Sequence, residues 1–400
     1  MWFWKLNCLV DSKAIGFRTM DFELMHHQEE FRELIESFAA KEIAPYADLW
    51  DERGEFPLDT ILKLGELGAF GITFPEEFGG LNLEFSTLCI AIEELAKVDS
   101  SVAITLSAGV GLGANPIFSF GSQEQKMRYL PSMCEGKALG AFGLTEPDAG
   151  SDAGATRTKV RLDEKTNEWV ISGSKAYITN SGTPITSVIT VTARDEDGVS
   201  TFLVPSGTPG LVVEPSYRKL GWHASDTHGL SLDEVRLPYE NLLGAKGRGF
   251  AQFLSILDDG RIAIAALALG LIEGCLAESI EYAKTRNAFG GPIGRYQAVA
   301  FMCSDMATKA SAARHLVYHA AWLKDNSKPY KQAAAMAKLF ATEAAVEVSR
   351  SATQIFGGAG FIEGNAVARH YRDAKILEIG EGTSEIQRLV IARSLGLPQK

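Results

Sequence analysis

Apolar residues recur at helical spacing through the first third of the chain. Residues three and four positions apart lie on one side of a helix, so this spacing predicts helices that each bury one face. The stretch 102–112 is apolar at almost every position, which predicts a helix buried on all sides. The pattern therefore predicts a helical domain over residues 21–140. Further helices are expected at 58–67, 88–96 and 122–134, after a first helix whose apolar face holds Phe31, Leu34, Ile35 and Phe38.

A different pattern runs from 141 to 248, where short β-branched or alternating segments are separated by Gly, Pro, Asn and Asp. No intervening segment is long enough for a helical crossover, which predicts an antiparallel sheet. Two polar loops are expected, 145–152 (TEPDAGSD) and 177–181 (YITNS). The first could offer donors to the edge of a polar ring, or it could simply form a structural turn. Strands are expected at 169–175, 185–193, 201–204 and 211–213.

Long helices rich in alanine and leucine return after residue 249, and this composition favours close packing in a bundle. They are expected at 258–286, 295–325 and 330–356. The predicted fold class is α+β with several domains. An N-terminal helical domain (21–140) and a small antiparallel β domain (141–248) precede a C-terminal domain resembling a four-helix bundle (249–400). Residues 1–20 are interpreted as an extension without fixed structure.

The stretch 376–388 (ILEIGEGTSEIQR) places one carboxylate, Glu381, between two glycines and just ahead of a helical pattern. Thr383 or Ser384 can cap that helix. Glu381 then has two interpretations. As an anion at a helix start, it would interact favourably with the helix dipole. As a carboxyl group buried behind the apolar segment 374–379, it would have a raised pKa and could act as a base near neutral pH.

Composition and charge argue against several classes of protein. The net charge is -11 and no run of Lys or Arg occurs, so we expect no nucleic-acid partner. No apolar run approaches the roughly 20 residues of a membrane span, so we expect no span. The five cysteines are odd in number, widely spaced and without a CxxC motif. This spacing predicts reduced thiols and neither a disulfide framework nor a zinc site.

Two further patterns are typical of ligand sites but have simpler explanations. Gly109, Gly111 and Ala114 match the dinucleotide fingerprint G-x-G-x-x-A, but Asn115 and Pro116 follow at once and no second strand appears. His315 and His319 have the spacing of a helical metal pair, but no Glu stands beside them and no third ligand is evident. We interpret the histidines as part of a half-exposed helix face and expect no metal.

Six motifs follow one another along the chain: AFGLTEPDAGSD (141–152), KAYITN (175–180), GWHASDTH (221–228), RNAFGGPIGRYQ (286–297), QIFGGAGF (354–361) and IGEGTSEIQR (379–388). Each motif is weak alone, but six in order make a specific signal. Their order and spacing resemble the acyl-CoA dehydrogenase family, over about residues 21–398.

The resemblance implies an enzyme that uses FAD to dehydrogenate an acyl-CoA thioester between its α- and β-carbons. A carboxylate takes the α-proton while hydride leaves the β-carbon, and the short- and medium-chain branch places this base at the position of Glu381. Other members place the base at the position of Gly260, which has no carboxylate here. Electrons would pass to an electron-transfer flavoprotein. A homotetramer is implied, in the cytoplasm of a bacterium or the mitochondrial matrix of a eukaryote.

The resemblance also implies binding residues. The flavin ring is expected near Phe142, Leu144, Thr145 and Ser151, and against Tyr177 and Thr179. The family often has tryptophan in place of Tyr177, so the stacking is expected to differ. The rest of FAD would be bound across a subunit boundary by Arg286, Phe289, Tyr296, Gln297, Gln354 and Gly358, with further contacts from Thr383 and Glu385. The acyl-CoA is expected near Ser151, Asp258, Arg261 and Gly382. For Arg261, an ion pair with Asp258 or Asp259 is the plain alternative, and both roles can hold.

Two other functions compete with this one. The first is an oxygen-using relative, such as an acyl-CoA oxidase or a flavin monooxygenase. The second is a catalytically silent member that binds DNA, which the net charge of -11 argues against.

Gly380 bears on the substrate. Straight-chain members of the family commonly carry tyrosine there, whereas isovaleryl-type members have glycine. Glycine would leave width for a methyl branch, or it would serve only the backbone turn.

Overall fold

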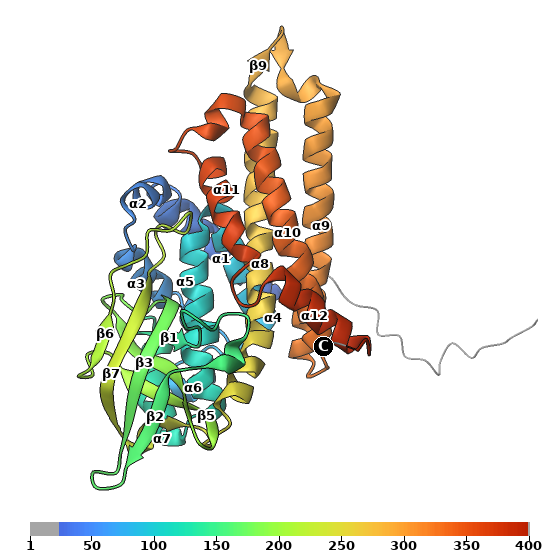
Figure 1. Ribbon diagram of the computed structural model, residues 1–400. Helices are drawn as coiled ribbons and strands as arrows, with labels where there is room; N and C mark the ends of the chain where they lie inside the picture. The colour runs from blue at the N-terminus through green and yellow to red at the C-terminus, as the bar shows by residue number, and fades with distance from the viewer. Residues whose placement is uncertain (1–23, 399–400) are drawn as a thin grey trace, which may run out of the picture.

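The computed structural model describes residues 24–398, which form a helical part, a β-sheet and a second helical part in chain order (Figure 1). Helices occupy the chain as far as Cys134, strands run between Leu139 and Leu243, and helices resume at Gly249. This architecture confirms the predicted fold class. The expected extension, residues 1–20, lies outside the described residues.

The N-terminal helices form largely where the apolar spacing predicts them. α1 (His26–Phe38) buries Phe31, Ile35 and Phe38, whereas Leu34 is 41% exposed because it lies at the edge of the apolar stripe. α5 (Ser100–Ala108) is buried at every position. A π-helical turn, Gly109–Ala114, follows α5 directly, so the dinucleotide fingerprint lies within helix and not after a strand. The other helices of this part are α2 (Ala47–Arg53), α3 (Leu58–Glu66), α4 (Phe85–Val98), α6 (Asn115–Phe120) and α7 (Gln123–Cys134).

The β part is a single eight-stranded sheet in the order β6-β7-β3-β2-β4-β5-β8, with β1 paired to β4. Most pairs are antiparallel, as predicted, but β1 (Leu139–Gly143) runs parallel to β4 (Thr186–Asp195). β3 (Glu168–Thr179) extends through the segment 177–179, which was expected to be a loop. The predicted strands correspond to β3, β4, β5 (Gly198–Pro205) and β6 (Leu211–Val213); β1, β2 (Lys159–Asp163), β7 (Thr227–Pro238) and β8 (Leu242–Leu243) were not predicted.

A central helix, α8 (Gly249–Thr285), connects the two helical parts. It packs against α4 on the N-terminal side and against α9 (Gln297–Asp325) and α10 (Lys331–Phe356) in the bundle. A two-stranded hairpin, β9 (Asn287–Ala288) with β10 (Gly291–Pro292), caps the far end of the bundle (Figure 1). α11 (Ala366–Leu377) and α12 (Ser384–Ser394) pack on α10 and complete the chain.

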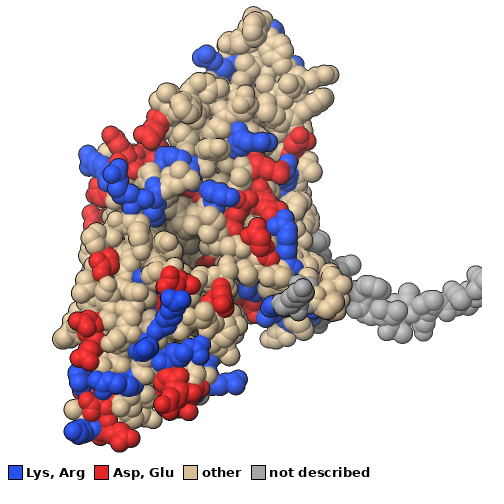
Figure 2. All heavy atoms as spheres, in the orientation of Figure 1, with Lys and Arg blue, Asp and Glu red and all other residues tan. Residues whose placement is uncertain are grey.

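Two helical segments differ from the expectation of no membrane-length apolar run. Ser100–Phe120 and Gly249–Thr285 are long and apolar enough to cross a membrane by length and composition. In each, 78% of the most apolar window is buried inside the protein, so packing in the core accounts for the apolar sequence. Figure 2 shows acidic and basic side chains interspersed over one face of the described residues, without a continuous basic surface on that face.

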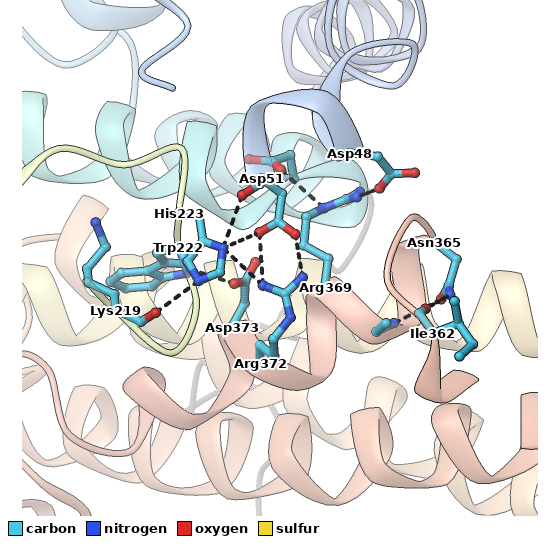
Figure 3. A network of polar contacts seen from close by, with 12 residues as sticks. Asp48, Asp51, Lys219, Trp222, His223, Ile362, Asn365, Arg369, Arg372 and Asp373 are labelled. Carbon is cyan, nitrogen blue, oxygen red and sulfur yellow. Dashed lines mark hydrogen bonds and ion pairs between the residues drawn. The ribbon is translucent and has the colours of Figure 1, made fainter. Parts of the chain in front are cut away.

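A buried polar network joins three parts of the fold around α11 (Figure 3). Asp373 accepts hydrogen bonds from the Ser100 hydroxyl and from the Trp222 backbone N–H, each at 2.6 Å. Arg372 donates to the Asp51 carboxylate of α2, and the His223 ring lies 3.0 Å from the same carboxylate. The N-terminal helices and the loop between β6 and β7 are therefore both tied to α11.

We expect Asp373→Ala to lower the free energy of unfolding by about 3 kcal/mol, because two buried donors and Arg369 lose a shared partner. The midpoint of thermal unfolding measures the effect. Asp233→Ala is the control, because Asp233 is exposed on β7 and should change the stability by less than about 0.5 kcal/mol. Equal midpoints for the two variants would contradict a structural role for the network.

Candidate active site

Glu381 lies in the tight turn between α11 and α12. Its backbone is left-handed, with φ at 53°, and the next residue, Gly382, has φ at 95°. A non-glycine residue in this region stores strain that persists only when the surroundings impose it. The Thr383 hydroxyl accepts a hydrogen bond from the Ile386 N–H at 3.3 Å, so Thr383 is the cap of α12. The turn therefore points Glu381 inward and begins the last helix at once.

The Glu381 carboxyl group is enclosed against α8. The residue as a whole is half-buried, but its Oε2 is buried and has no hydrogen-bond partner among the described residues. Oε2 lies over Gly260, so close that a Cβ at that position would overlap it. Burial raises the pKa of the carboxyl to about 7, and the charges of Lys338 and Arg261 oppose this rise. These are the properties of a buried base and not of an exposed helix-capping anion.

Two side chains that the sequence did not single out hold the turn in place. The Lys338 ammonium group of α10 donates to the Gly382 carbonyl oxygen at 2.7 Å, and Gln387 Nε2 of α12 donates to the same oxygen at 2.8 Å. Both residues are fully buried. Burial lowers the pKa of Lys338 to about 8, against the effect of the Glu381 charge. The sequence offered one local signal for Lys338, a lysine on the face of an alanine-rich helix that is expected to be buried.

Asp258 and Arg261 form an ion pair one helical turn apart on α8. Arg261 is buried and follows Gly260, against which Glu381 Oε2 lies, and its charge acts on Glu381. The neighbouring Asp259 makes different contacts, with the Tyr330 hydroxyl at 2.6 Å and the Lys324 ammonium at 2.8 Å. The expected ion pair of Arg261 is thus confirmed with Asp258. Its contact with acyl-CoA stays a prediction.

The residues expected beside the flavin ring come together at the ends of β1 and β3. The Ala176 N–H donates to the Thr145 carbonyl oxygen at 2.9 Å, so the two motifs are neighbours. The Phe142 ring stacks on Phe253 of α8 with 3.9 Å between centroids. Phe253 and Gly260 are two helical turns apart on one face of α8, roughly 10 Å along its axis. One face of α8 therefore contacts the expected ring site at Phe253 and Glu381 at Gly260. Of the other residues expected there, Leu144 is buried, Thr179 is half-buried, and Ser151 and Tyr177 are exposed.

A second group of expected FAD contacts lies elsewhere, at the end of the bundle that carries the β9–β10 hairpin (Figure 1). Most of its side chains are exposed, Phe289 at 91%, whereas Tyr296 is half-buried. A single chain does not bring this group to the turn that holds Glu381. The group consists of Arg286, Phe289, Tyr296 and Gln297 around the hairpin, and Gln354 and Gly358 at the end of α10. Thr383 and Glu385 lie instead at the start of α12.

Three family models match successive parts of the chain. They describe the acyl-CoA dehydrogenase N-terminal domain at residues 25–137, the middle domain at 141–235 and the C-terminal domain at 247–396. Curated relatives match over nearly the whole chain. "Probable acyl-CoA dehydrogenase YngJ" of Bacillus subtilis (strain 168) is 48% identical, over 94% of this chain and 100% of that protein. The mitochondrial "Short-chain specific acyl-CoA dehydrogenase" of Mus musculus is 43% identical, over 93% of this chain and 91% of that protein.

Solved structures share the fold. A butyryl-CoA dehydrogenase from Megasphaera elsdenii has a TM-score of 0.91 and 42% identity, over 94% of this chain and 100% of that one. A chain described under the electron transferring flavoprotein of Acidaminococcus fermentans has a TM-score of 0.91 and 44% identity, over 94% of this chain and 99% of that one. An acyl-CoA dehydrogenase complexed with FAD from Bacillus anthracis has a TM-score of 0.89 and 32% identity, over 93% of this chain and 67% of that one.

Proposed function

The chain belongs to the acyl-CoA dehydrogenase family, and we propose that Glu381 is the base that removes the α-proton of a short-chain acyl-CoA. The chain is an oxidoreductase that dehydrogenates an acyl-CoA between its α- and β-carbons, with FAD as cofactor. The observation that carries the assignment of the base is the enclosed Glu381 Oε2 above Gly260. The two positions at which the family places its base are therefore in contact across one site.

The residues present fit FAD. The ends of β1 and β3 offer Thr145 and the 67% exposed ring of Tyr177, and β1 reaches α8 through the stacked rings of Phe142 and Phe253. When bound, FAD accepts the hydride that leaves the β-carbon. Glu381 Oε2 takes the α-proton, and the enclosure that raises its pKa keeps water from competing for it. The Glu381 N–H is proposed to donate to the thioester carbonyl, where negative charge develops as the proton leaves.

A short acyl chain is proposed from the relatives, whose names include short-chain and butyryl-CoA dehydrogenases. Gly380 adds a feature of this chain. Its φ is not left-handed, so the turn does not require glycine there. A Cβ at this position would meet only the Ile376 carbonyl oxygen, at 3.5 Å. The space beside the base therefore supports a pocket wide enough for a methyl branch.

We expect Gly380→Tyr to lower kcat/KM for a branched acyl-CoA about tenfold more than for the straight chain of equal length, because one methyl group in an apolar pocket discriminates by roughly 1–3 kcal/mol. Steady-state kinetics on the two substrates measures the ratio. Gly380→Ala is the matched control, because a methyl group makes only an ordinary contact there and should leave the ratio unchanged. An equal loss on both substrates would show that Gly380 serves the backbone alone.

Electron-transfer flavoprotein is the proposed acceptor, supported by the structural relative described with that protein. The test compares turnover of the FAD-loaded enzyme with electron-transfer flavoprotein, with an artificial acceptor and with oxygen alone. Turnover with the first two but not with oxygen is expected. Rapid turnover with oxygen alone would favour the oxidase alternative, and no turnover with any acceptor would favour a silent member of the family.

FAD is proposed to span two subunits of a homotetramer. This proposal is supported by the distance along the bundle between the hairpin group and Glu381 (Figure 1). It accounts for the outward-facing Phe289, which a second subunit would cover.

Domain boundaries at 21–140, 141–248 and 249–400 are proposed from the change of element type near residues 139 and 249. Because the relatives include bacterial and mitochondrial proteins, we propose the cytoplasm or the mitochondrial matrix as its location.

A further inference from the structure

Lys338 is a buried cation without a contacting anion. It is fully buried on α10, where all other buried residues but two hydroxyl side chains are apolar. No carboxylate within the described residues lies within 4.0 Å of its Nζ, although buried lysines are nearly always paired with one. Its hydrogen bond goes instead to a backbone carbonyl, that of Gly382. Such an expensive arrangement indicates a role beyond packing.

The carbonyl that Lys338 holds belongs to the residue after Glu381. Glu381 has a left-handed backbone although it is not a glycine, and such strain persists only where the surroundings impose it. Donors on both α10 and α12 converge on the single Gly382 oxygen, at 2.7 and 2.8 Å. Because Glu381 Oε2 rests against Gly260, a small shift of this turn moves the carboxylate off the site.

We propose that Lys338 is a positioning residue for Glu381, which holds the turn through the Gly382 carbonyl and stabilises the ionised carboxylate with its charge. This inference rests on the proposed role of Glu381 as base. Gln387 also holds the turn through the Gly382 carbonyl, but it is neutral and adds no charge beside the carboxylate. Variants of the two donors therefore separate the effect of position from the effect of charge.

Other charges also act on Lys338 and Glu381, and they stay the same in every variant of the test. Arg261 approaches from α8 and is paired with Asp258. The charges of Glu378, at the end of α11, and Glu385, at the start of α12, also act on Lys338. Arg261 remains in every variant below, so a change in the pH profile reports the charge at position 338.

The sign of the effect follows from the charges. A nearby cation favours the ionised carboxylate and lowers its pKa, so removal of the Lys338 charge raises the pKa of Glu381 further. The base then ionises only at a higher pH. The acidic limb of the pH profile of kcat/KM therefore moves upward by about one pH unit.

The experiment measures kcat/KM of the FAD-loaded enzyme from about pH 5 to 9 for Lys338→Met, Gln387→Met and Lys338→Arg. Lys338→Met should move the acidic limb upward and lower the plateau by about tenfold or more, because the turn loosens. Gln387→Met should lower the plateau without moving the limb. Lys338→Arg, which keeps the charge and the hydrogen-bond donors, should leave the acidic limb at its wild-type position.

A second readout isolates proton transfer. With the flavin reduced beforehand, exchange of the substrate α-proton with solvent deuterium reports the base without the hydride step, and its pH dependence should shift in the same way. Lys97→Met is the control, because Lys97 is paired with Glu273, roughly 20 Å along α8 from Gly260. It removes a lysine charge elsewhere and should leave the limb in place. If Lys338→Met loses FAD, Lys338→Gln, a shorter neutral donor, takes its place in both measurements.

An unmoved limb in the neutral variants of Lys338, or an equal movement in Gln387→Met, would overturn the proposal. Glu381→Gln distinguishes a wrong role for Lys338 from a wrong assignment of the base. If Glu381→Gln is inactive and Lys338→Met keeps the wild-type profile, only the role of Lys338 is wrong. If Glu381→Gln is as active as wild type, the assignment of the base is wrong and the inference fails with it.

Discussion

Glu381→Gln should lower kcat by about a thousandfold or more while FAD and substrate still bind, because general-base catalysis contributes roughly 10²–10⁴ and the proposed mechanism has no second base. Glutamine keeps the shape of the side chain and removes the basic oxygen. Saturating kinetics measures kcat, and flavin absorbance after gel filtration measures retained FAD. Glu347→Gln is the control, because the Glu347 side chain is exposed and paired with Lys309, and its charge acts on neither Glu381 nor Lys338, so turnover should stay near normal.

The same substitution should change how stability depends on pH. The folded-state pKa of Glu381 is about 7, above the value of 4.5 for an unperturbed glutamate. The folded protein therefore binds more protons than the unfolded chain between these values, and its stability falls as the pH rises through them. Glu381→Gln should remove this loss and be more stable than wild type by about 2–3 kcal/mol above neutral pH. A lower stability than wild type at that pH would contradict an uncompensated buried carboxylate.

Gly260→Ala should lower kcat about a hundredfold with little change in stability, because the new methyl group displaces the Glu381 carboxylate and a misplacement of about 1 Å can cost that much. The displaced atoms end a flexible side chain, so the backbone need not move. In a Glu381→Gly background, Gly260→Ala should cause no further loss. A double-mutant cycle on kcat measures this coupling. Additive losses would mean that Gly260→Ala acts on something other than Glu381.

The companion pair, Gly260→Glu with Glu381→Gly, moves the carboxylate from the turn to α8. Activity above that of Glu381→Gly alone is expected, since the two positions are in contact. No recovery would show that a carboxylate on α8 does not reach the α-carbon.

Local chemistry explains which structural predictions held. The apolar stripe of α1, the cap of α12 by Thr383 and the end of α10 at Phe356 depend on residues a few positions apart, which the sequence displays directly. β1 and β7 were missed for the opposite reason. β1 is rich in glycine and pairs in parallel with β4, more than forty residues away, so no local pattern marks it. β7 begins at the last two residues of the motif GWHASDTH and contains Asp233 and Glu234, residue types that are uncommon in strands.

The sequence by itself determined that this chain folds as helices, a sheet and helices, and that Glu381 is a candidate base. Those conclusions depend on periodicity and on motifs, which are properties of the chain order. Only the tertiary structure placed Glu381 against Gly260, 121 positions earlier in the sequence, and turned Lys338 and Gln387 onto one carbonyl. The pKa of a carboxyl group depends on the water and the charges around it, and α8, α10 and α12 supply these surroundings only once they pack together.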